Sequence, residues 1–381
     1  MPPFLATAVL SLTLFTVTFA VNLQAPLYGA YAADSGVGAT AVTVAFAAYV
    51  AGLMPTLLLL GGLSDRIGRR MPLAAALLLG FGATALLAAA PSFSSLVAAR
   101  VLLGIGTALA TTAGAAYMTE IMGEARSRTA ALVVTSATSL GFGGGALATG
   151  VSLGVQGQTF VPANFLSLFA IVPVLVVAAL LLPRAVSLLR LPVFPTETWV
   201  FGAAMLLAWS ATGMTIAVVP LELTARGLGG WTGLIIFLAI FVGFLSQPLA
   251  RRMTNARSLA LGMMLVPGGF LVLLLGVWTQ TLAPILLGTA ITSSASYGFS
   301  YLAALAEVGD RAPTERARAT AGLFVWAYAG FSIPVIGSGI VADALGMEAA
   351  LIAFGGVLLT ASGAIMALWM RRGRTVGAVF A

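Results

Sequence analysis

Twelve apolar runs of about 20 residues follow one another along nearly the whole chain, and each could cross the ~30 Å hydrocarbon core of a bilayer as a helix. A membrane-spanning helix satisfies its backbone hydrogen bonds internally, so the pattern predicts an all-α membrane protein with 12 transmembrane helices. The predicted helices cover approximately residues 5–28, 40–60, 72–90, 95–118, 129–152, 162–182, 199–220, 230–249, 258–277, 283–305, 319–341 and 348–370.

The composition agrees with a membrane protein. Of the 381 residues, 60% are apolar and 8% are charged, which is too little polar surface for a water-soluble domain of this size. The net charge of +7 comes from arginines that are spread between the apolar runs, so we expect no nucleic-acid partner. Cysteine and histidine are absent, which removes the common nucleophiles and metal ligands. We therefore expect no cofactor, no metal site and no enzymatic activity.

The positions of the arginines predict the orientation in the membrane. If the N-terminus is cytoplasmic, all 18 basic residues except Arg100 and Arg226 fall in cytoplasmic segments. The positive-inside rule then places both termini in the cytoplasm. We expect a multi-pass protein of a bacterial inner membrane. The first apolar run has no basic residues before it, so we interpret it as a helix and not as a signal peptide.

The stretch 183–198 is rich in proline and divides six predicted helices from six, which is typical of a cytoplasmic linker. The expected parts are an N-terminal six-helix bundle (1–182), the linker, a C-terminal six-helix bundle (199–370) and a cytoplasmic tail (371–381). The two halves share sequence features: residues 128–132 (RTAAL) after Glu124 correspond to residues 319–323 (ATAGL) after Glu315. Two pseudo-symmetric bundles with a site at their interface are a known plan of transporters.

Residues 61–73 (GGLSDRIGRRMPL) form the first strongly charged segment, and its outer glycines suit a tight turn. The segment resembles the loop 2–3 signature of the major facilitator superfamily, which it matches at Gly61, Leu63, Asp65, Arg66, Gly68, Arg69 and Leu73. The resemblance implies the major facilitator fold and transport by alternating access. It also implies that a conformational switch is formed by Gly61, Asp65, Arg66, Gly68, Arg69 and Arg70. In that role Asp65 would latch the two halves at the helix N-terminus near Ala319 and Thr320.

A second resemblance lies in the fourth predicted helix, where residues 100–104 (RVLLG) are similar to the R-x-x-q-G element of the superfamily, with Leu103 in place of Gln. Arg100 would lie ~8–13 Å inside the membrane, where a guanidinium needs water or a partner. It could clamp the first helix through Asn22, Gln24 or nearby carbonyls, bind an anionic group of the substrate, or snorkel to the headgroups. Helical spacing puts one polar and small face toward a predicted water-filled cavity: Arg100, Gly104, Thr107, Thr111, Gly114 and Met118.

Other candidate cavity residues come from predicted helices 1, 7 and 10, because helices 1, 4, 7 and 10 surround the cavity in the superfamily. They are Asn22, Gln24, Pro26, Trp209, Ser293, Tyr297 and Tyr301. Glu222 is the candidate coupling acid, and the alternative is an ion pair with Arg226. Glycines at 141–145 and at 150 and 154 are interpreted as packing positions. Drug–proton antiporters carry G-P-x-x-G-G here, and this chain departs from that motif at Phe142 and Ala146.

The leading functional hypothesis is a secondary active transporter, and specifically an efflux permease for a drug or metabolite. Protons are the candidate coupling ion of such an antiporter. The alternatives are an importer of a small organic anion or sugar and an integral membrane protein without transport activity. The expected partners are a small-molecule substrate and the lipid bilayer, and we expect a monomer.

Overall fold

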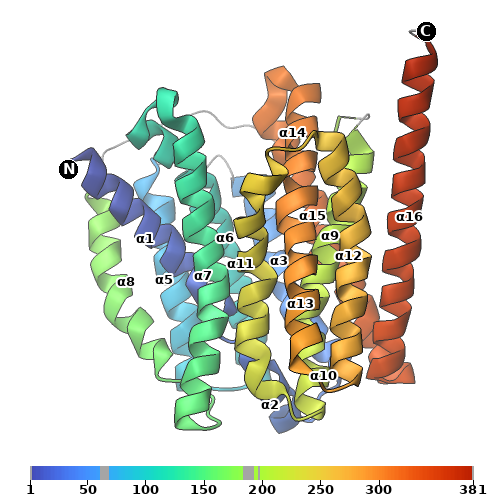
Figure 1. The fold of residues 1–381 in the computed structure, drawn as a ribbon. Helices are drawn as coiled ribbons and strands as arrows, with labels where there is room; N and C mark the ends of the chain where they lie inside the picture. Colours follow the sequence, from blue (N-terminus) through green and yellow to red (C-terminus); the bar gives the residue numbers. More distant parts are fainter. Residues whose placement is uncertain (1, 61–67, 183–192, 196–197, 380–381) are drawn as a thin grey trace. The chain divides into compact units, whose positions relative to one another are not determined.

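The computed structural model describes residues 2–60, 68–182, 193–195 and 198–379, and these residues are almost entirely helical with no strand among them (Figure 1). Three residues of the predicted switch, Gly61, Asp65 and Arg66, lie outside the described residues. The chain forms two compact units. Unit 1 comprises Met1–Leu191 and Leu223–Phe237, and unit 2 comprises Pro192–Glu222 and Leu238–Ala381.

The first part of the chain, up to the linker, contains seven described α-helices. They are α1 (Pro3–Asn22), α2 (Tyr28–Ser35), α3 (Ala39–Leu60), α5 (Arg70–Ala89), α6 (Phe93–Met122), α7 (Ser127–Gln156) and α8 (Asn164–Leu180). The prediction of one continuous helix over 5–28 is wrong. Helix α1 ends at Asn22, and the short 3-10 helix η1 (Ala25–Leu27), which contains Pro26, separates α1 from α2. Proline lacks the backbone N–H that a continuing α-helix needs.

The second part of the chain follows the linker. Its elements are α9 (Trp199–Ala217), α10 (Val219–Ala225), η4 (Gly229–Trp231), α11 (Thr232–Ala250), α12 (Asn255–Trp278), α13 (Leu282–Ser293), η5 (Ser294–Ser300), α14 (Tyr301–Arg311), η6 (Pro313–Glu315), α15 (Arg316–Leu345) and α16 (Met347–Val379). The predicted helix 283–305 is helical but contains the π-helical segment η5, and helix α16 continues through most of the stretch that we interpreted as a cytoplasmic tail.

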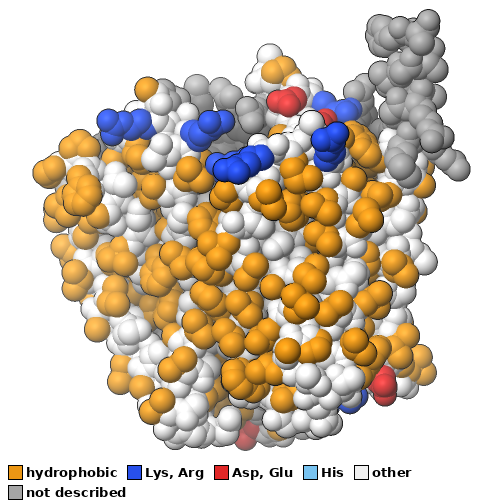
Figure 2. Space-filling view, in the orientation of Figure 1, with side chains coloured by type: hydrophobic (Ala, Val, Ile, Leu, Met, Phe, Trp, Pro, Cys, Tyr) orange, Lys and Arg blue, Asp and Glu red, His pale blue; other side chains and the backbone are white. Residues whose placement is uncertain are grey.

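All twelve predicted runs are helical in the described residues, which confirms the all-α membrane fold. Ten helices are long and apolar enough to cross a membrane, judged by length and composition alone. Helix α8 is apolar but shorter, and the remaining run is the one interrupted by η5. Figure 2 shows one face of the molecule, on which hydrophobic side chains cover the middle and the blue arginines lie at its margin.

The two units repeat one packing plan. In unit 1, α1 packs against α7, and α5 packs against α6 and α8. In unit 2, α9 packs against α15, and α12 packs against α13 and α16. Helices α7 and α15 have 30 residues each and both follow a 3-10 turn, η2 (Glu124–Arg126) and η6. The predicted pseudo-symmetry of the two six-helix halves is therefore visible in their packing.

Glycines let helix α7 approach its neighbours closely within unit 1. A Cβ atom on Gly141 or Gly145 would collide with the backbone carbonyl of Phe15 or Phe19 in α1. A Cβ atom on Gly233 of α11 would lie 2.9 Å from the Cα atom of Gly150. These contacts confirm the packing role that was predicted for this stretch of α7, because small residues allow membrane helices to approach. Gly154 is the exception, since open space surrounds it.

Candidate functional site

The described part of the charged loop joins three helices of unit 1. Gly68 has φ of +84°, in the left-handed region that glycine adopts at little cost, as the turn prediction required. The side chain of Arg69 is almost fully buried, and its Nε and Nη2 atoms donate to Glu120 Oε1 over 2.9 and 2.6 Å. Arg70 Nη1 donates to the carbonyl of Leu180 at the end of α8. Both arginines therefore connect the start of α5 to other helices, in addition to any effect on the orientation of the protein in the membrane.

Glu120 was not among the residues that sequence reasoning selected. The available signal was an acid two residues past the end of the fourth predicted helix (95–118), followed by a loop that contains further arginines. That pattern does not specify which arginine would reach it. The fold decides the pairing by placing the start of α5 beside the end of α6, since these two helices pack against each other.

Arg100 lies in α6 and is 1% exposed. Its Nη1 atom donates to the carbonyl of Val21 over 2.9 Å, and its Nη2 atom donates to the carbonyl of Phe46 over 3.1 Å. The guanidinium carbon also lies 4.7 Å from the ring centroid of Tyr49 and 5.2 Å from that of Phe46. Arg100 therefore joins α6 to α1 and α3 and does not snorkel to the headgroups.

Electrostatics explains how this buried cation is tolerated. Val21 belongs to the last turn of α1, where backbone carbonyls have no intrahelical partner and carry the negative end of the helix dipole. Two aromatic faces add cation–π attraction, which is stronger in a desolvated site. The planar fork of arginine can donate to two carbonyls in different directions, whereas an ammonium is a point charge. The observed contacts match the clamp account, with backbone carbonyls as acceptors.

The face of α6 around Arg100 was predicted to line a water-filled cavity, and in this structure Gly104 and Thr107 lie in helix contacts. A Cβ atom on Gly104 would collide with the backbone of α3 at Tyr49 and Leu53, so the two helices are in close contact there. Thr107 is fully buried, and its hydroxyl donates to the carbonyl of Leu103. The small residues serve helix packing, which competes with cavity lining for the same residue types. Thr111 is half-buried.

The three candidates at the end of α1 also make contacts inside the protein. Asn22 Nδ2 donates to the carbonyl of Phe142 over 2.8 Å, which links α1 to α7. Gln24 Nε2 donates to the carbonyl of Val21 over 2.8 Å, and Pro26 is half-buried in η1. The structure thus brings Gln24 and Arg100 to one carbonyl, that of Val21.

In unit 2, Trp209 and Tyr297 belong to one aromatic cluster, and Tyr301 lies beside it. Ser293 accepts a hydrogen bond from the backbone N–H of Gly243 over 2.8 Å, so its hydroxyl oxygen binds α11. Glu222 is buried in α10. Sequence reasoning missed three rings of α15 that complete the cluster: Phe324, Tyr328 and Phe331. Their spacing of four and three residues places them on one helical face, which is the signal that could have found them.

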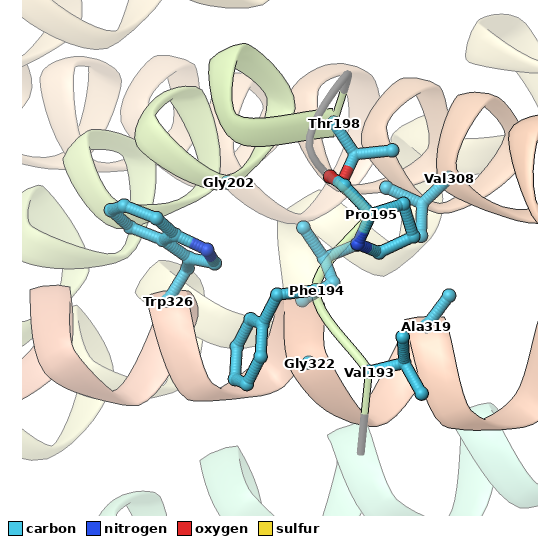
Figure 3. Close-up of a pocket in the computed structure, with 10 residues that line it drawn as sticks. Val193, Phe194, Pro195, Thr198, Gly202, Val308, Ala319, Gly322 and Trp326 are labelled. Carbon is cyan, nitrogen blue, oxygen red and sulfur yellow. The ribbon is translucent and has the colours of Figure 1, made fainter.

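Figure 3 shows a small crevice in unit 2, where the chain before α9 crosses α15. The crevice holds about 190 Å³ of space between atoms, including its mouth. The backbone N–H of Val193 donates to the carbonyl of Arg318 over 3.1 Å, and a Cβ atom on Gly322 would collide with the carbonyl of Val193. This crevice therefore marks where the end of the linker is anchored on α15.

The described residues form ten long apolar helices and one shorter one in two repeated units, with Arg100 clamped inside unit 1, which is the architecture of a polytopic membrane protein. The chain belongs to the major facilitator superfamily, whose family model matches residues 10–266, more than half of its length. That superfamily consists of membrane transporters. No curated protein matches the chain.

Solved structures share the fold. A mutant of the nucleoside transporter NupG is 13% identical with a TM-score of 0.76, and the match covers 95% of this chain and 99% of that one. A bacterial homologue of the human lysosomal transporter Spinster, in an inward-facing and occupied conformation, is 14% identical with a TM-score of 0.72, and the match covers 97% and 98%. At these identities the similarity shows the fold alone.

Proposed function

We propose that the protein is a secondary active transporter that moves a small organic solute by alternating access. The observation that carries this proposal is the repetition of one packing plan in two compact units, in a chain that belongs to the major facilitator superfamily. Two rigid bundles of similar construction can rock about a site near the bilayer midplane.

For the direction of transport we propose efflux of a drug or metabolite across a bacterial inner membrane, with both termini cytoplasmic. The support for efflux is the sequence pattern around Pro26 and the efflux-type loops, and the distribution of the arginines supports the orientation. Reporter fusions at residue 190 and after residue 374 test the orientation. A periplasmic signal from either fusion would contradict it.

The alternative of importing an organic anion loses its main candidate residue in this structure, because Arg100 is buried and donates to two backbone carbonyls. The NupG structure is that of a nucleoside transporter, so an uncharged, ring-bearing solute is a substrate class worth including in any screen. Sugar import is separated from efflux by the direction of flux.

The deciding experiment is solute flux in proteoliposomes without ATP, with the protein oriented by protease accessibility. We expect flux that follows an imposed gradient, and uptake into inside-out vesicles when a proton gradient is applied. Glu222→Gln should abolish the dependence on the proton gradient while leaving downhill exchange intact if Glu222 is the coupling acid. Absence of flux for every compound in a broad screen would count against the transport proposal, and unchanged proton coupling in Glu222→Gln would remove that residue from the role.

A further inference from the structure

An indole in unit 2 is surrounded by aromatic rings from two other elements. The ring of Trp209 in α9 lies 5.3 Å from Tyr297 of η5, at 49°. It lies 5.3 Å from Tyr328, 6.0 Å from Phe331 and 6.1 Å from Phe324, all in α15 and all close to edge-on. We call these five residues the Trp209 cluster.

The Trp209 cluster has a buried floor and an accessible rim. Trp209 is 7% exposed and Phe331 is 9% exposed, whereas Tyr297, Phe324 and Tyr328 are only half-buried. The exposed ring edges and faces offer surface against which a flat group can stack.

Two polar atoms on α9 at this place lack a hydrogen-bond partner among the described residues: Trp209 Nε1 and, one turn further, Thr212 Oγ1. Thr212 is 1% exposed. Its neighbours on the helix behave differently, since the hydroxyls of Ser210 and Thr215 each donate to a backbone carbonyl. Buried donors without acceptors are rare and costly, so each such atom calls for an explanation. A hydrogen-bond acceptor on a bound molecule would provide this explanation.

The backbone that carries Tyr297 is also unusual. Residues 294–300 form a π-helical segment, a conformation that is rare and concentrated at functional sites. Ser296 of this segment donates to the carbonyl of Ala208, the residue before Trp209, over 2.7 Å. This hydrogen bond fixes η5 against α9 where the two rings meet.

No described acid belongs to the Trp209 cluster. The acids of unit 2 in the described part of the chain lie in α10, in the last turns of α14 and α15, in η6 and in the first turn of α16. The unpartnered Nε1 donor of Trp209 needs a hydrogen-bond acceptor, which a cationic group does not offer. The surroundings therefore favour an uncharged group that carries an acceptor.

We infer that the Trp209 cluster binds a planar, uncharged aromatic or heteroaromatic group that carries a hydrogen-bond acceptor, through ring stacking and donation from Trp209 Nε1. This inference rests on the proposed transport function, since it names the chemical class of the transported solute.

The test uses two matched probes, benzamide and cyclohexanecarboxamide, which share an uncharged amide and differ in the planarity of the ring. Binding to the full-length protein in lipid nanodiscs is measured by ligand-observed saturation transfer up to tens of millimolar. We expect benzamide to bind about fivefold more tightly than cyclohexanecarboxamide. Trp209→Phe keeps a ring but removes the donor, and should weaken benzamide binding about fivefold, the effect of one hydrogen bond.

The matched control is Trp278→Phe, which removes another indole N–H without a described partner, at the last residue of α12 and outside the cluster. It should leave benzamide binding unchanged within about twofold. Tyr328→Leu should reduce the preference for the planar ring while the thermal stability and elution profile report folding. Equal binding of the two amides, no binding of either, or an equal loss in both tryptophan variants would overturn the inference.

The flux assay separates this inference from the proposed function. Flux without any preference for planar solutes refutes the ligand class and leaves the transporter assignment in place. Specific benzamide binding without flux of any compound refutes the transport proposal and leaves the binding site.

Discussion

Replacing Arg100 with alanine removes the connection between three helices of unit 1. The wild-type guanidinium donates to the carbonyls of Val21 and Phe46 and stacks over the rings of Phe46 and Tyr49. Hydrogen bonds from charged groups contribute about 1.5–3 kcal/mol each, and a desolvated cation–π contact about 1–2 kcal/mol. The sum overestimates the effect, because interhelical hydrogen bonds in membranes average only ~0.6 kcal/mol and burying the cation is itself costly. We expect a net destabilisation of about 2–4 kcal/mol.

At about 2–3 °C per kcal/mol, Arg100→Ala should lower the melting temperature by about 5–10 °C. Arg100→Lys keeps the charge but not the planar fork, so it should lose about half as much stability. If Arg100 is a clamp, flux falls at least about tenfold in both variants while ligand binding is largely kept. If it binds an anionic substrate as a point charge, the lysine variant retains much of the transport.

The assay is thermal unfolding of detergent-purified protein followed by size exclusion, combined with flux in proteoliposomes. Arg252→Ala is the matched control, because it removes one positive charge from an exposed position at the end of α11. Wild-type stability in Arg100→Ala would refute the clamp. Wild-type stability together with wild-type flux would refute any role for the buried cation.

Three further perturbations test other contacts. Gly233→Val should destabilise the protein by about 1–3 kcal/mol, because its side chain would overlap Gly150. Gly154→Val is the control, because its side chain would point into open space, and its stability in the same thermal assay should be within about 0.5 kcal/mol of wild type. Glu120→Gln should cost about 1 kcal/mol by weakening the ion pair with the buried Arg69, and an unchanged melting temperature would show that the pair contributes nothing. Asp65→Asn should reduce flux at least about tenfold at normal folded yield if the loop is a conformational switch. Unchanged flux would show that the loop only sets the orientation of the protein in the membrane.

The membrane fold could be read from the sequence because each helix in a lipid environment satisfies its own backbone hydrogen bonds, so its existence is a local property of about 20 residues. The same holds for the turn at Gly68, whose positive φ depends on the residue itself. The break before α2 was not decided by Pro26 alone, because Pro55, Pro173 and Pro267 lie inside uninterrupted helices. The correspondence between the two six-helix halves was visible as a repeated sequence pattern.

The tertiary structure alone decided what the polar residues contact. Arg100 was recognisable as a buried cation, but its acceptors are carbonyls of α1 and α3, which exist as acceptors only where the helices approach. Gly104 and Thr107 looked like cavity residues because small and hydroxylated side chains suit both water and close helix packing, and packing prevailed. The Trp209 cluster joins α9, η5 and α15, which are far apart in the chain. Contacts of this kind depend on how helices pack together, and hydrophobic periodicity records which face of a helix is buried without specifying its neighbour.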